Sequence, residues 1–381
     1  MSIIKLTLDH VRNIEHASLT PDPKLNIIYG ANASGKTSLL EAIHLLGSAR
    51  SFRTARVNQI ISRDQACLTV FAHVAGIQQA ADMHHLENIG LERCKDKTRI
   101  RINQENVQQS SILATKLPLQ VITPESHDIL EQGPKFRRQL LDWGLFHVKQ
   151  GYLDTVKAYL RVLRQRNAAL RKTSAVANTE SDSAQQEHAR VLVKSFNKPL
   201  VDGAEQVNHY RQDYVASIQD KIIDMTQQLC GETITVHYQS GWKAGEDYAD
   251  ALAKQFDSDC NRHHTQSGPH RADLVFKVAG VPIQQAFSRG QQKMLVCALR
   301  LAQLQYYFEQ TGHAAVVLVD DLAAELDKTH RQRLLALLMA SEAQVFITLT
   351  DKDLLDSSNI SSKKMFHVEH GKITDVAASV V

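Results

Sequence analysis

The stretch Gly30-Ala31-Asn32-Ala33-Ser34-Gly35-Lys36-Thr37 decides the fold of this chain, because it matches the phosphate-binding pattern G-x-x-x-x-G-K-[ST] at every fixed position. Residues 25–29, directly before it, are apolar enough for a buried strand. Positions 39, 40, 43 and 46, after it, are apolar at helical spacing. A strand, a loop and a helix in this order turn backbone N–H groups inward above a helix N-terminus. The sequence therefore predicts an anion site.

The residue types of this loop indicate a nucleotide with its metal ion. Lys36 is placed to meet the β- and γ-phosphates, and the Thr37 hydroxyl is placed to hold Mg²⁺. The alternative is a chance match in a glycine-containing turn, but the flanking strand and helix argue against it. We therefore expect residues 30–37 to bind the phosphates of ATP.

Length and composition are typical of a globular protein. The 381 residues predict two or three domains, with 43% apolar and 22% charged residues. There is no run of 18 apolar residues and no signal peptide at the start, so we expect a cytoplasmic protein without a membrane partner. The net charge of +3 means that any nucleic-acid surface must be a local patch. The five scattered cysteines contain no C-x-x-C pair and are expected to be reduced thiols.

Hydrophobic patterning divides the chain into an α/β part and a helical part. An apolar stripe of helical period runs through residues 207–229, and the small polar residues 173–186 predict a mobile loop between two helices. After residue 269 the α/β pattern returns, and its strands are assigned to a parallel sheet. The predicted strands are residues 3–8, 25–29, 67–75, 98–102, 118–122, 274–278, 316–319 and 344–349, and residues 293–308 are predicted helical.

The predicted fold class is α/β, with a mixed sheet and helices around the phosphate loop. Residues 1–130 and 266–381 form the expected ATP-binding lobe, and residues 131–265 form an inserted helical lobe. No heptad pattern is long enough for an extended coiled coil.

An apolar strand ending in two carboxylates, Val316-Val317-Leu318-Val319-Asp320-Asp321, supplies the second half of the site. In P-loop proteins such a strand lies beside the phosphate loop, and its terminal Asp binds Mg²⁺. Asp320 is the candidate metal ligand, and Asp321 is the candidate catalytic residue that orients the attacking water. The alternative is that two acidic residues end a strand at the surface.

Ser288-Arg289-Gly290-Gln291-Gln292 opens the helix before the acidic strand and is a candidate second anion site. The alternative is an ordinary Ser N-cap. A helix of roughly 20 residues spans about 30 Å, whereas the returning strand covers only about 17 Å. Ser288 is therefore expected beyond this chain's own phosphates, where a second subunit brings it to the nucleotide.

Together these motifs resemble the nucleotide-binding head of the ABC ATPases and, more narrowly, the RecF family of bacterial recombination-repair proteins. The resemblance runs from residue 3 to about residue 350. It is carried by Val11-Arg12-Asn13, the phosphate loop with Leu40-Glu41-Ala42-Ile43, Ser51-Phe52-Arg53, Pro124-Glu125, Arg137-Arg138, Leu141-Asp142-Trp143, Gly268-Pro269-His270-Arg271, Ser288 to Gln292, Asp320-Asp321 and Ala324-Glu325-Leu326-Asp327.

The resemblance implies an ABC-type head with ATP held between two subunits. Ser288, Gly290 and Gln291 of one chain contact the nucleotide held by Lys36 of the other, and Arg12 joins the nucleotide contacts. It further implies a weak, DNA-stimulated ATPase that acts as a conformational switch. Such a protein is nucleoid-associated, binds gaps or junctions between single- and double-stranded DNA, and acts with RecO and RecR to load RecA in recombinational repair, replication restart and the SOS response.

This sequence departs from the family pattern at two positions. Ala33 stands where the family has Gly, which lowers nucleotide affinity if that position needs an unusual backbone angle, at a cost of about 1 kcal/mol. Thr350 stands where ABC ATPases commonly have a His, a feature shared with RecF-like proteins, so slow turnover is expected.

Candidate DNA contacts are basic residues on two predicted helices. Lys and Arg neutralise phosphates without reading sequence, and the alternative is a solvated helix face. Arg50 and Arg53 closely follow the first helix. They are either further DNA contacts or part of the nucleotide or dimer face. The candidates are Arg137 and Arg138 on one helix, and Arg161 and Arg164 with Arg166, Arg171 and Lys172 on the next. The competing functions are a small-molecule phosphotransferase and an ABC transporter subunit.

Overall fold

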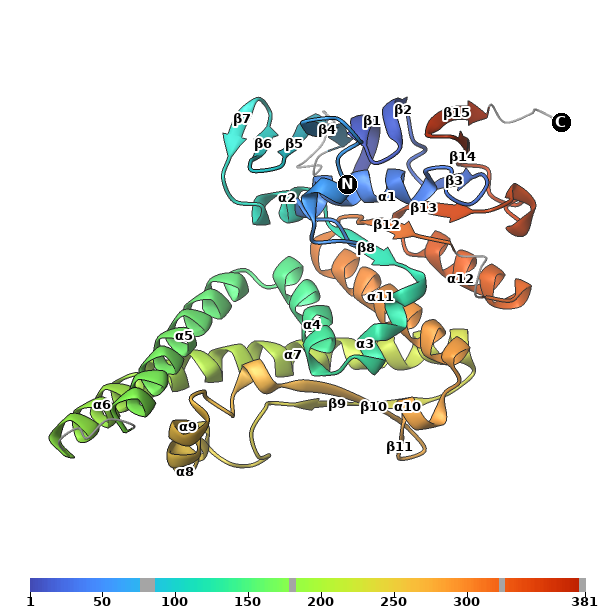
Figure 1. Ribbon diagram of the computed structural model, residues 1–381. Coiled ribbons are helices and arrows are strands. Elements are labelled where there is room, and N and C mark those ends of the chain that lie inside the picture. The colour runs from blue at the N-terminus through green and yellow to red at the C-terminus, as the bar shows by residue number, and fades with distance from the viewer. Residues whose placement is uncertain (76–85, 178–182, 322–325, 377–381) are drawn as a thin grey trace. The chain divides into compact units, whose positions relative to one another are not determined.

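The structure, a computed structural model, describes residues 1–75, 86–177, 183–321 and 326–376 (Figure 1). The chain divides into two compact units. Unit 1 consists of Met1–His127, Gln228–Gly231 and Arg289–Val381, and unit 2 consists of Asp128–Gln227 and Glu232–Ser288. The chain therefore leaves the unit that carries the phosphate loop and later returns to it.

Unit 1 contains a largely parallel sheet with the strand order β15-β14-β3-β13-β12-β8. Its central strands are short, mostly apolar segments that are buried on both faces, as parallel strands covered by helices require. The edge strand β15 pairs with β14 in antiparallel fashion. The bounds are β3 (Leu25–Tyr29), β8 (Leu119–Ile122), β12 (Val316–Val319), β13 (Gln344–Leu349), β14 (Lys363–Glu369) and β15 (Lys372–Val376).

The second sheet of unit 1 is antiparallel, with the order β2-β1-β4-β5-β6-β7. Along β4 the burial of side chains alternates, so one face of this sheet packs on the core and the other is open. The bounds are β1 (Ser2–Val11), β2 (Ile14–Leu19), β4 (Cys67–Ala75), β5 (Leu86–Cys94), β6 (Thr98–Ile102) and β7 (Glu105–Val107).

Helix α1 (Lys36–Ser48) is the centre of the core of unit 1. Its apolar side chains share one cluster with the inner faces of both sheets, so the helix that follows the phosphate loop is held by both (Figure 1). The opposite side of the parallel sheet is covered by α11 (Arg289–Thr311) and α12 (Lys328–Ala340). Shorter elements are η1 (Val57–Gln59), α2 (Ser111–Lys116), η2 (Pro124–His127) and η4 (Lys352–Leu354).

Unit 2 is mostly helical but also contains a small antiparallel sheet with the order β11-β10-β9. Arg166 and Asp259, both fully buried, form an ion pair with an Nη1–oxygen distance of 2.8 Å. The bounds are α3 (Asp128–Glu131), α4 (Pro134–Val148), α5 (Tyr152–Ala177), α6 (Ser183–Ser195), α7 (Asn197–Cys230), β9 (Ile234–Gln239), α8 (Tyr248–Lys254), α9 (Phe256–Arg262), η3 (Pro269–Arg271), β10 (Asp273–Val278), β11 (Val281–Pro282) and α10 (Ile283–Ala286).

The division into lobes differs from the predicted one at its second boundary. The first boundary, predicted after residue 130, lies after residue 127. Residues 266–288, predicted in the ATP-binding lobe, belong to unit 2, because β10 pairs in antiparallel register with β9 instead of joining the parallel sheet. The inserted lobe is therefore larger than predicted and not purely helical.

Most predicted elements are confirmed, including every strand named from the sequence. The predicted loop at 173–186 is shorter, because α5 continues to Ala177 and α6 begins at Ser183, and residues 178–182 lie outside the described residues. Among the described helices there is no long coiled coil, and none is long and apolar enough to cross a membrane.

The expectation that all five cysteines are reduced is wrong for two of them. Cys67 and Cys94 lie directly opposite each other where β4 pairs with β5, and they form a disulfide. The sequence hid this pair, because residues 27 positions apart become neighbours only through the strand register. Cys230, Cys260 and Cys297 are free thiols.

Alkylation of the denatured, unreduced protein is expected to label three cysteines, and prior reduction is expected to expose all five to the reagent. Cys67→Ser should lower the free energy of unfolding by about 3–4 kcal/mol, because the bond closes a loop of 27 residues in the unfolded chain. Mass spectrometry and denaturant unfolding measure these effects, and Cys260→Ser is the control. Labelling of all five cysteines without reduction would contradict the disulfide.

Candidate nucleotide-binding site

The phosphate loop connects β3 to α1 at the carboxyl edge of the parallel sheet. The Lys36 ammonium donates hydrogen bonds to the Gly30 and Ala31 carbonyl oxygens, at 2.8 and 2.9 Å, so the loop curves around its own lysine. A Cβ on Gly30 would lie 2.1 Å from the Val368 carbonyl oxygen of β14, so this position accepts no side chain. The predicted strand, loop and helix are confirmed in that order.

The loop is held from outside by the turn between β1 and β2. The Asn13 side-chain amide donates to the Ser34 carbonyl oxygen at 3.0 Å, and its oxygen accepts from the Ser38 hydroxyl at 2.8 Å. The Gly371 N–H donates to the same Ser34 carbonyl at 2.8 Å. These contacts fix the loop before any ligand binds, which reduces the entropy that binding must remove.

The acidic strand meets the phosphate loop through one carboxylate oxygen. Asp320 Oδ1 accepts hydrogen bonds from Thr37 Oγ1 at 3.0 Å and from Thr348 Oγ1 at 2.8 Å. The sequence placed this strand beside the loop, which the Thr37 contact confirms. In the sheet, however, β13 separates β12 from β3. Thr348 of β13 is therefore a functional neighbour that the sequence analysis missed.

Asp321 has a constrained backbone at the same edge. Its φ of 49° lies in the left-handed region, and its N–H donates to Thr348 Oγ1 at 2.7 Å. Its buried Oδ1 has no hydrogen-bond partner among the described residues. An unpaired buried carboxylate oxygen costs free energy and is left available for a ligand or a water molecule.

Burial opposes both charges of the site. It lowers the pKa of the Lys36 ammonium, although Asp321 and then Asp320 act in the opposite direction. Burial also raises the pKa of the Asp320 carboxyl, as does the neighbouring Asp321. The hydrogen bonds from Thr348 and Thr37, and the positive charge of Arg53, act to lower it.

The site fits a phosphate group with a hard cation. Ser34 Oγ is buried and has no partner among the described residues, so a donor in the loop is left for an anionic oxygen. Thr37 Oγ1 and Asp320 Oδ1 are adjacent oxygen ligands of the kind that Mg²⁺ prefers. A hydroxyl in the loop and the lysine can thus face a phosphate, while two oxygens face a cation.

Arg12 does not present a free guanidinium. It binds the fully buried Glu41 of α1 through two nitrogens, with Nη2 and Oε1 2.8 Å apart, and Ser51 donates to the same carboxylate. The structure therefore gives Arg12 a positioning role, between the β1–β2 turn and the helix behind the phosphate loop. The predicted direct contact of Arg12 with the nucleotide stays a prediction.

The predicted second anion site lies at the start of α11. Ser288 directly precedes the helix, and Ser288 and Gly290 are exposed, whereas Gln291 is half-buried. The helix has 23 residues, so it spans about 34 Å. The role of these residues toward a second subunit stays a prediction.

The structure corrects the candidate DNA contact Arg137. Only 6% of this residue is exposed, and its guanidinium binds Asp273 through Nε and Nη2, at 2.7 and 3.0 Å. Its Nη1 donates to two carbonyl oxygens of α3. The neighbouring Arg138 is half-buried, donates to the Ala272 carbonyl oxygen at 2.7 Å, and has a pKa lowered by burial. Arg138 keeps part of its side chain accessible, but Arg137 does not.

On α5 the structure separates the basic residues by helix face. Arg161, Arg164, Arg171 and Lys172 are exposed and remain candidate contacts. Arg166 is buried in the ion pair with Asp259 and is removed from the set. Helical periodicity contained this signal, because residue 166 follows the buried Leu163 by three positions and precedes the buried Leu170 by four.

Comparison with known proteins gives a consistent similarity over the whole chain. Residues 2–374 match the RecF/RecN/SMC N-terminal domain family. A protein of Hydrogenovibrio crunogenus described as DNA replication and repair protein RecF is 40% identical over 378 residues, covering 98% of this chain and 99% of the relative. A protein of Shewanella baltica with the same description is 41% identical over 381 residues, with the same coverage.

Solved structures share the fold. The recombination mediator protein RecF-ATP in the RecFOR pathway superimposes with a TM-score of 0.83 at 24% identity, covering 99% of this chain and 98% of that one. An Smc head domain with an extended coiled coil, from Pyrococcus furiosus, gives a TM-score of 0.59 at 18% identity, covering 98% and 96%. The fold of an ABC-type head without the long coiled coil is thereby shown.

Ala33 occupies the conformation that the sequence analysis identified as costly. Its φ is 63°, in the left-handed region, whereas Ala31 has a negative φ. Ala33→Gly should leave the free energy of unfolding unchanged or raise it by up to about 1 kcal/mol, whereas Ala31→Gly should lower it by about 0.5–1 kcal/mol. Denaturant unfolding of both variants measures this. Equal losses from the two substitutions would contradict the backbone account.

Asp320→Asn is expected to raise the melting temperature of the metal-free protein, because the amide oxygen still accepts from both threonines without a buried charge. The wild-type carboxyl has a raised pKa, so its penalty is fully present above that pKa and disappears as the pH falls toward the ordinary 3.8. The gain should therefore be largest at neutral pH. Melting curves from pH 8 to about 4 measure it.

The same substitution should weaken Mg²⁺-ATP binding at least about tenfold, or ~1.4 kcal/mol, because it removes an anionic metal ligand. Isothermal titration with Mg²⁺ and with EDTA measures this loss. A variant that is less stable without metal, or that binds Mg²⁺-ATP like the wild type, would contradict the assignment of Asp320.

Proposed function

The chain belongs to the RecF family of DNA replication and repair proteins, and from this premise we propose that it is an ATP-dependent DNA-binding repair protein. It dimerises on ATP, binds single-strand gaps or junctions between single- and double-stranded DNA, and helps to load RecA. Its hydrolysis of ATP is weak, is stimulated by DNA and resets the dimer. ATP binding and hydrolysis thus serve to switch the protein between two conformational states.

One observation carries the nucleotide part of the proposal, which is the contact of Thr37 with Asp320 at 3.0 Å across 283 positions of sequence. This contact brings the end of the acidic strand to the phosphate loop. Lys36 and Ser34 face the phosphates, and Thr37 and Asp320 hold Mg²⁺, which neutralises charge on the phosphate oxygens when bound. Asp321, whose Oδ1 has no partner among the described residues, orients the attacking water.

Slow turnover follows from the residues around this edge. Thr350, which follows β13, is exposed and offers a hydroxyl where an imidazole is common in ABC ATPases. A hydroxyl contributes no positive charge near the γ-phosphate, so less transition-state charge is stabilised. This chemistry suits a switch better than a motor.

Dimerisation brings hydrogen-bond donors of a second subunit to the γ-phosphate. Ser288 directly precedes a helix of 23 residues, and Gly290 and Gln291 lie in its first turn, where the helix dipole attracts an anion. In the dimer these residues of one subunit contact the γ-phosphate bound by Lys36 of the other. ATP therefore acts as part of the interface.

DNA binding uses exposed basic residues that contact phosphates. Arg161 and Arg164 on α5 are exposed, and Arg138 on α4 is partly accessible. These side chains recognise backbone shape rather than base sequence. RecO and RecR are the proposed partners, supported by the similarity to a mediator of the RecFOR pathway.

Sedimentation of the wild type and of Ser288→Arg, with ATP or ADP and with a short gapped duplex, tests the proposal. The wild type should dimerise with ATP but not with ADP, and the dimer should bind the gapped duplex better than the monomer does. Ser288→Arg should weaken the dimer at least about 100-fold, or ~2.7 kcal/mol, because a bulky cation replaces a small donor at the interface.

Ser195→Arg, which adds the same charge at an exposed position of α6, is the control and should dimerise normally. A wild type that binds ATP and stays monomeric would contradict the role of Ser288. A rapid monomeric phosphotransferase would then be the reading to test.

A further inference from the structure

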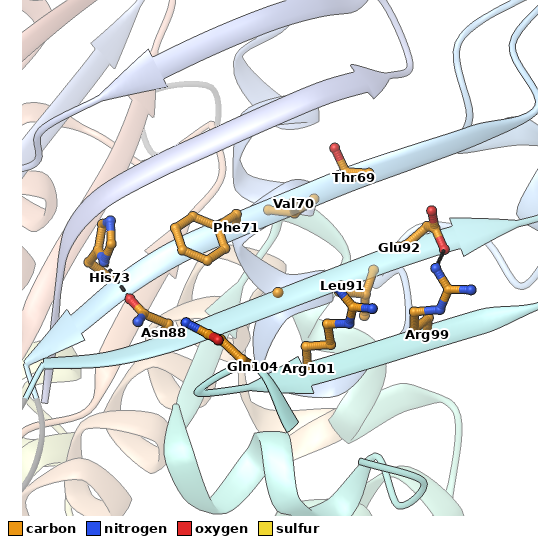
Figure 2. Close-up of a pocket in the computed structure, with 11 residues that line it drawn as sticks. Thr69, Val70, Phe71, His73, Asn88, Leu91, Glu92, Arg99, Arg101 and Gln104 are labelled. Atoms are coloured by element: carbon orange, nitrogen blue, oxygen red, sulfur yellow. Dashed lines mark hydrogen bonds and ion pairs between the residues drawn. The ribbon is translucent and has the colours of Figure 1, made fainter. Parts of the chain in front are cut away.

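The open face of the antiparallel sheet in unit 1 holds a cavity of about 690 Å³ that the nucleotide site does not use (Figure 2). Phe71 of β4 is opposite Gly90 of β5, and Gly90 is opposite Arg101 of β6. Phe71 is 37% exposed, an unusual position for a large aromatic ring on a sheet. In this row across three strands, Gly90, which has no side chain, lies between the aromatic ring of Phe71 and the guanidinium of Arg101.

Gly90 is the residue that this chain's own packing does not explain. Its φ lies outside the left-handed region, so its backbone does not need a glycine. An added Cβ would meet Phe71 Cδ2 at 3.5 Å, an ordinary contact, so the packing does not need one either. A glycine inside a strand weakens the strand and often marks the close approach of a ligand.

The space above Gly90 is bounded on one side by Phe71, whose Cδ2 would lie 3.5 Å from a Cβ at Gly90. Two strand spacings separate the backbones of β4 and β6 by about 9–10 Å. Phe71 and Arg101 stand at the two sides of this slot, and stacked aromatic rings prefer centroid distances of about 4.5–7 Å. A planar group inserted over Gly90 can therefore contact the phenyl ring on one side and the guanidinium on the other.

Hydrogen-bonding groups surround the slot (Figure 2). His73 packs edge-on against Phe71 at a centroid distance of 5.0 Å, and its Nδ1 contacts Asn88 Oδ1 at 2.6 Å. On the other side Arg99 pairs with Glu92 at 3.1 Å. Both donors and acceptors are available to the edge of a planar base.

A cationic cavity of about 840 Å³ lies on the other face of the same strands, because its Arg93 is opposite the buried Leu68 of β4, and it shares Arg99 with the slot. Arg50, Arg93 and Lys97 also line it, and no carboxylate is among the described residues that do so. Four cations in one groove fit a chain of phosphates. Lys97 in the turn between β5 and β6 and Arg99 of β6 lie near this end of the sheet, so a nucleic-acid strand that passes around the end can use both cavities.

We propose that the slot formed by Phe71, Gly90 and Arg101 binds an unpaired base of single-stranded DNA. The same strand then passes around the β5–β6 turn, and the groove lined by Arg50, Arg93, Lys97 and Arg99 on the other face binds its phosphates. Proteins that hold single strands without reading sequence combine an aromatic platform with a positive groove. This inference deepens the proposed function and rests on it, since it names the surface that takes the unpaired strand of a gap.

Two substitutions test the slot without loss of the fold. Gly90→Val fills the space above the strand with a residue that favours strands, so stability should be unchanged or higher. Phe71→Leu keeps an apolar side chain and removes the ring. Both should weaken binding to a short oligothymidine strand that carries one 2-aminopurine by about tenfold or more. Phe308→Leu on α11 is the matched control, because Phe308 is also 37% exposed.

The readouts are fluorescence anisotropy for affinity and quenching of 2-aminopurine for stacking. Blunt duplex DNA should bind the wild type and both slot variants equally, because its bases are paired. Lys97→Gln should lower the slope of log affinity against log salt by about 0.7 for single strands. A polyglutamate peptide should show no dependence on Phe71.

Single-strand affinity and quenching that are the same in Gly90→Val, Phe71→Leu and the wild type would overturn the inference, as would an equal loss of polyglutamate binding. ATP-dependent dimerisation and gap binding are measured on the same proteins. If these fail while single-strand binding still depends on Phe71, the proposed function is wrong and the slot stands. If the wild type and both slot variants dimerise and bind gaps and single strands alike, the slot alone is wrong.

Discussion

The arrangement of the nucleotide site depends on the carboxylate of Asp320, which accepts hydrogen bonds from Thr37 and Thr348 at once. Three segments that are far apart in sequence meet at this oxygen. Burial makes the charge costly, and two hydroxyl donors offset only part of that cost, since the pKa of the carboxyl remains raised. The site therefore carries electrostatic strain that the proposed Mg²⁺ would relieve. Affinity for a metal and stability without it oppose each other at one residue.

The sequence predicted strands from two patterns that are readable in one segment at a time. In β12 and the mostly apolar β13 every side chain is buried, whereas in β1 buried and exposed positions alternate. Strand β10 was recognised but placed in the wrong sheet, because a strand's own residues do not name its partner. Strand β9 was missed, since its buried and exposed positions alternate within a mostly polar segment. The disulfide was missed for the same reason that β10 was misplaced, because both depend on which strands pair and in which register.

Two neighbouring arginines show which properties of the site cannot be predicted from the sequence. Arg137 and Arg138 are neighbours with the same chemistry, yet only Arg137 lies at the centre of the face of α4 that contains the buried Leu140, Leu141 and Gly144. A cation on an apolar face requires an acidic partner from elsewhere, here Asp273, which no local pattern reveals. Thr348 likewise became part of the site only when β13 was placed between β12 and β3. Helical periodicity predicts which side chains are buried, whereas their interaction partners can be identified only once the fold is known.

The proposed slot on the open sheet face gives the proposed preference for gaps over duplex a physical basis. A base reaches the slot over Gly90 only when it is unstacked, and flipping a base out of a duplex costs a few kcal/mol. The unpaired strand of a gap has already lost that pairing, so stacking on Phe71 is gained without the penalty. In the proposed complex, the cations of the groove contact phosphates in either form and contribute little to the distinction. Selectivity for DNA structure would therefore lie with the ring and the glycine, and general affinity with the charges.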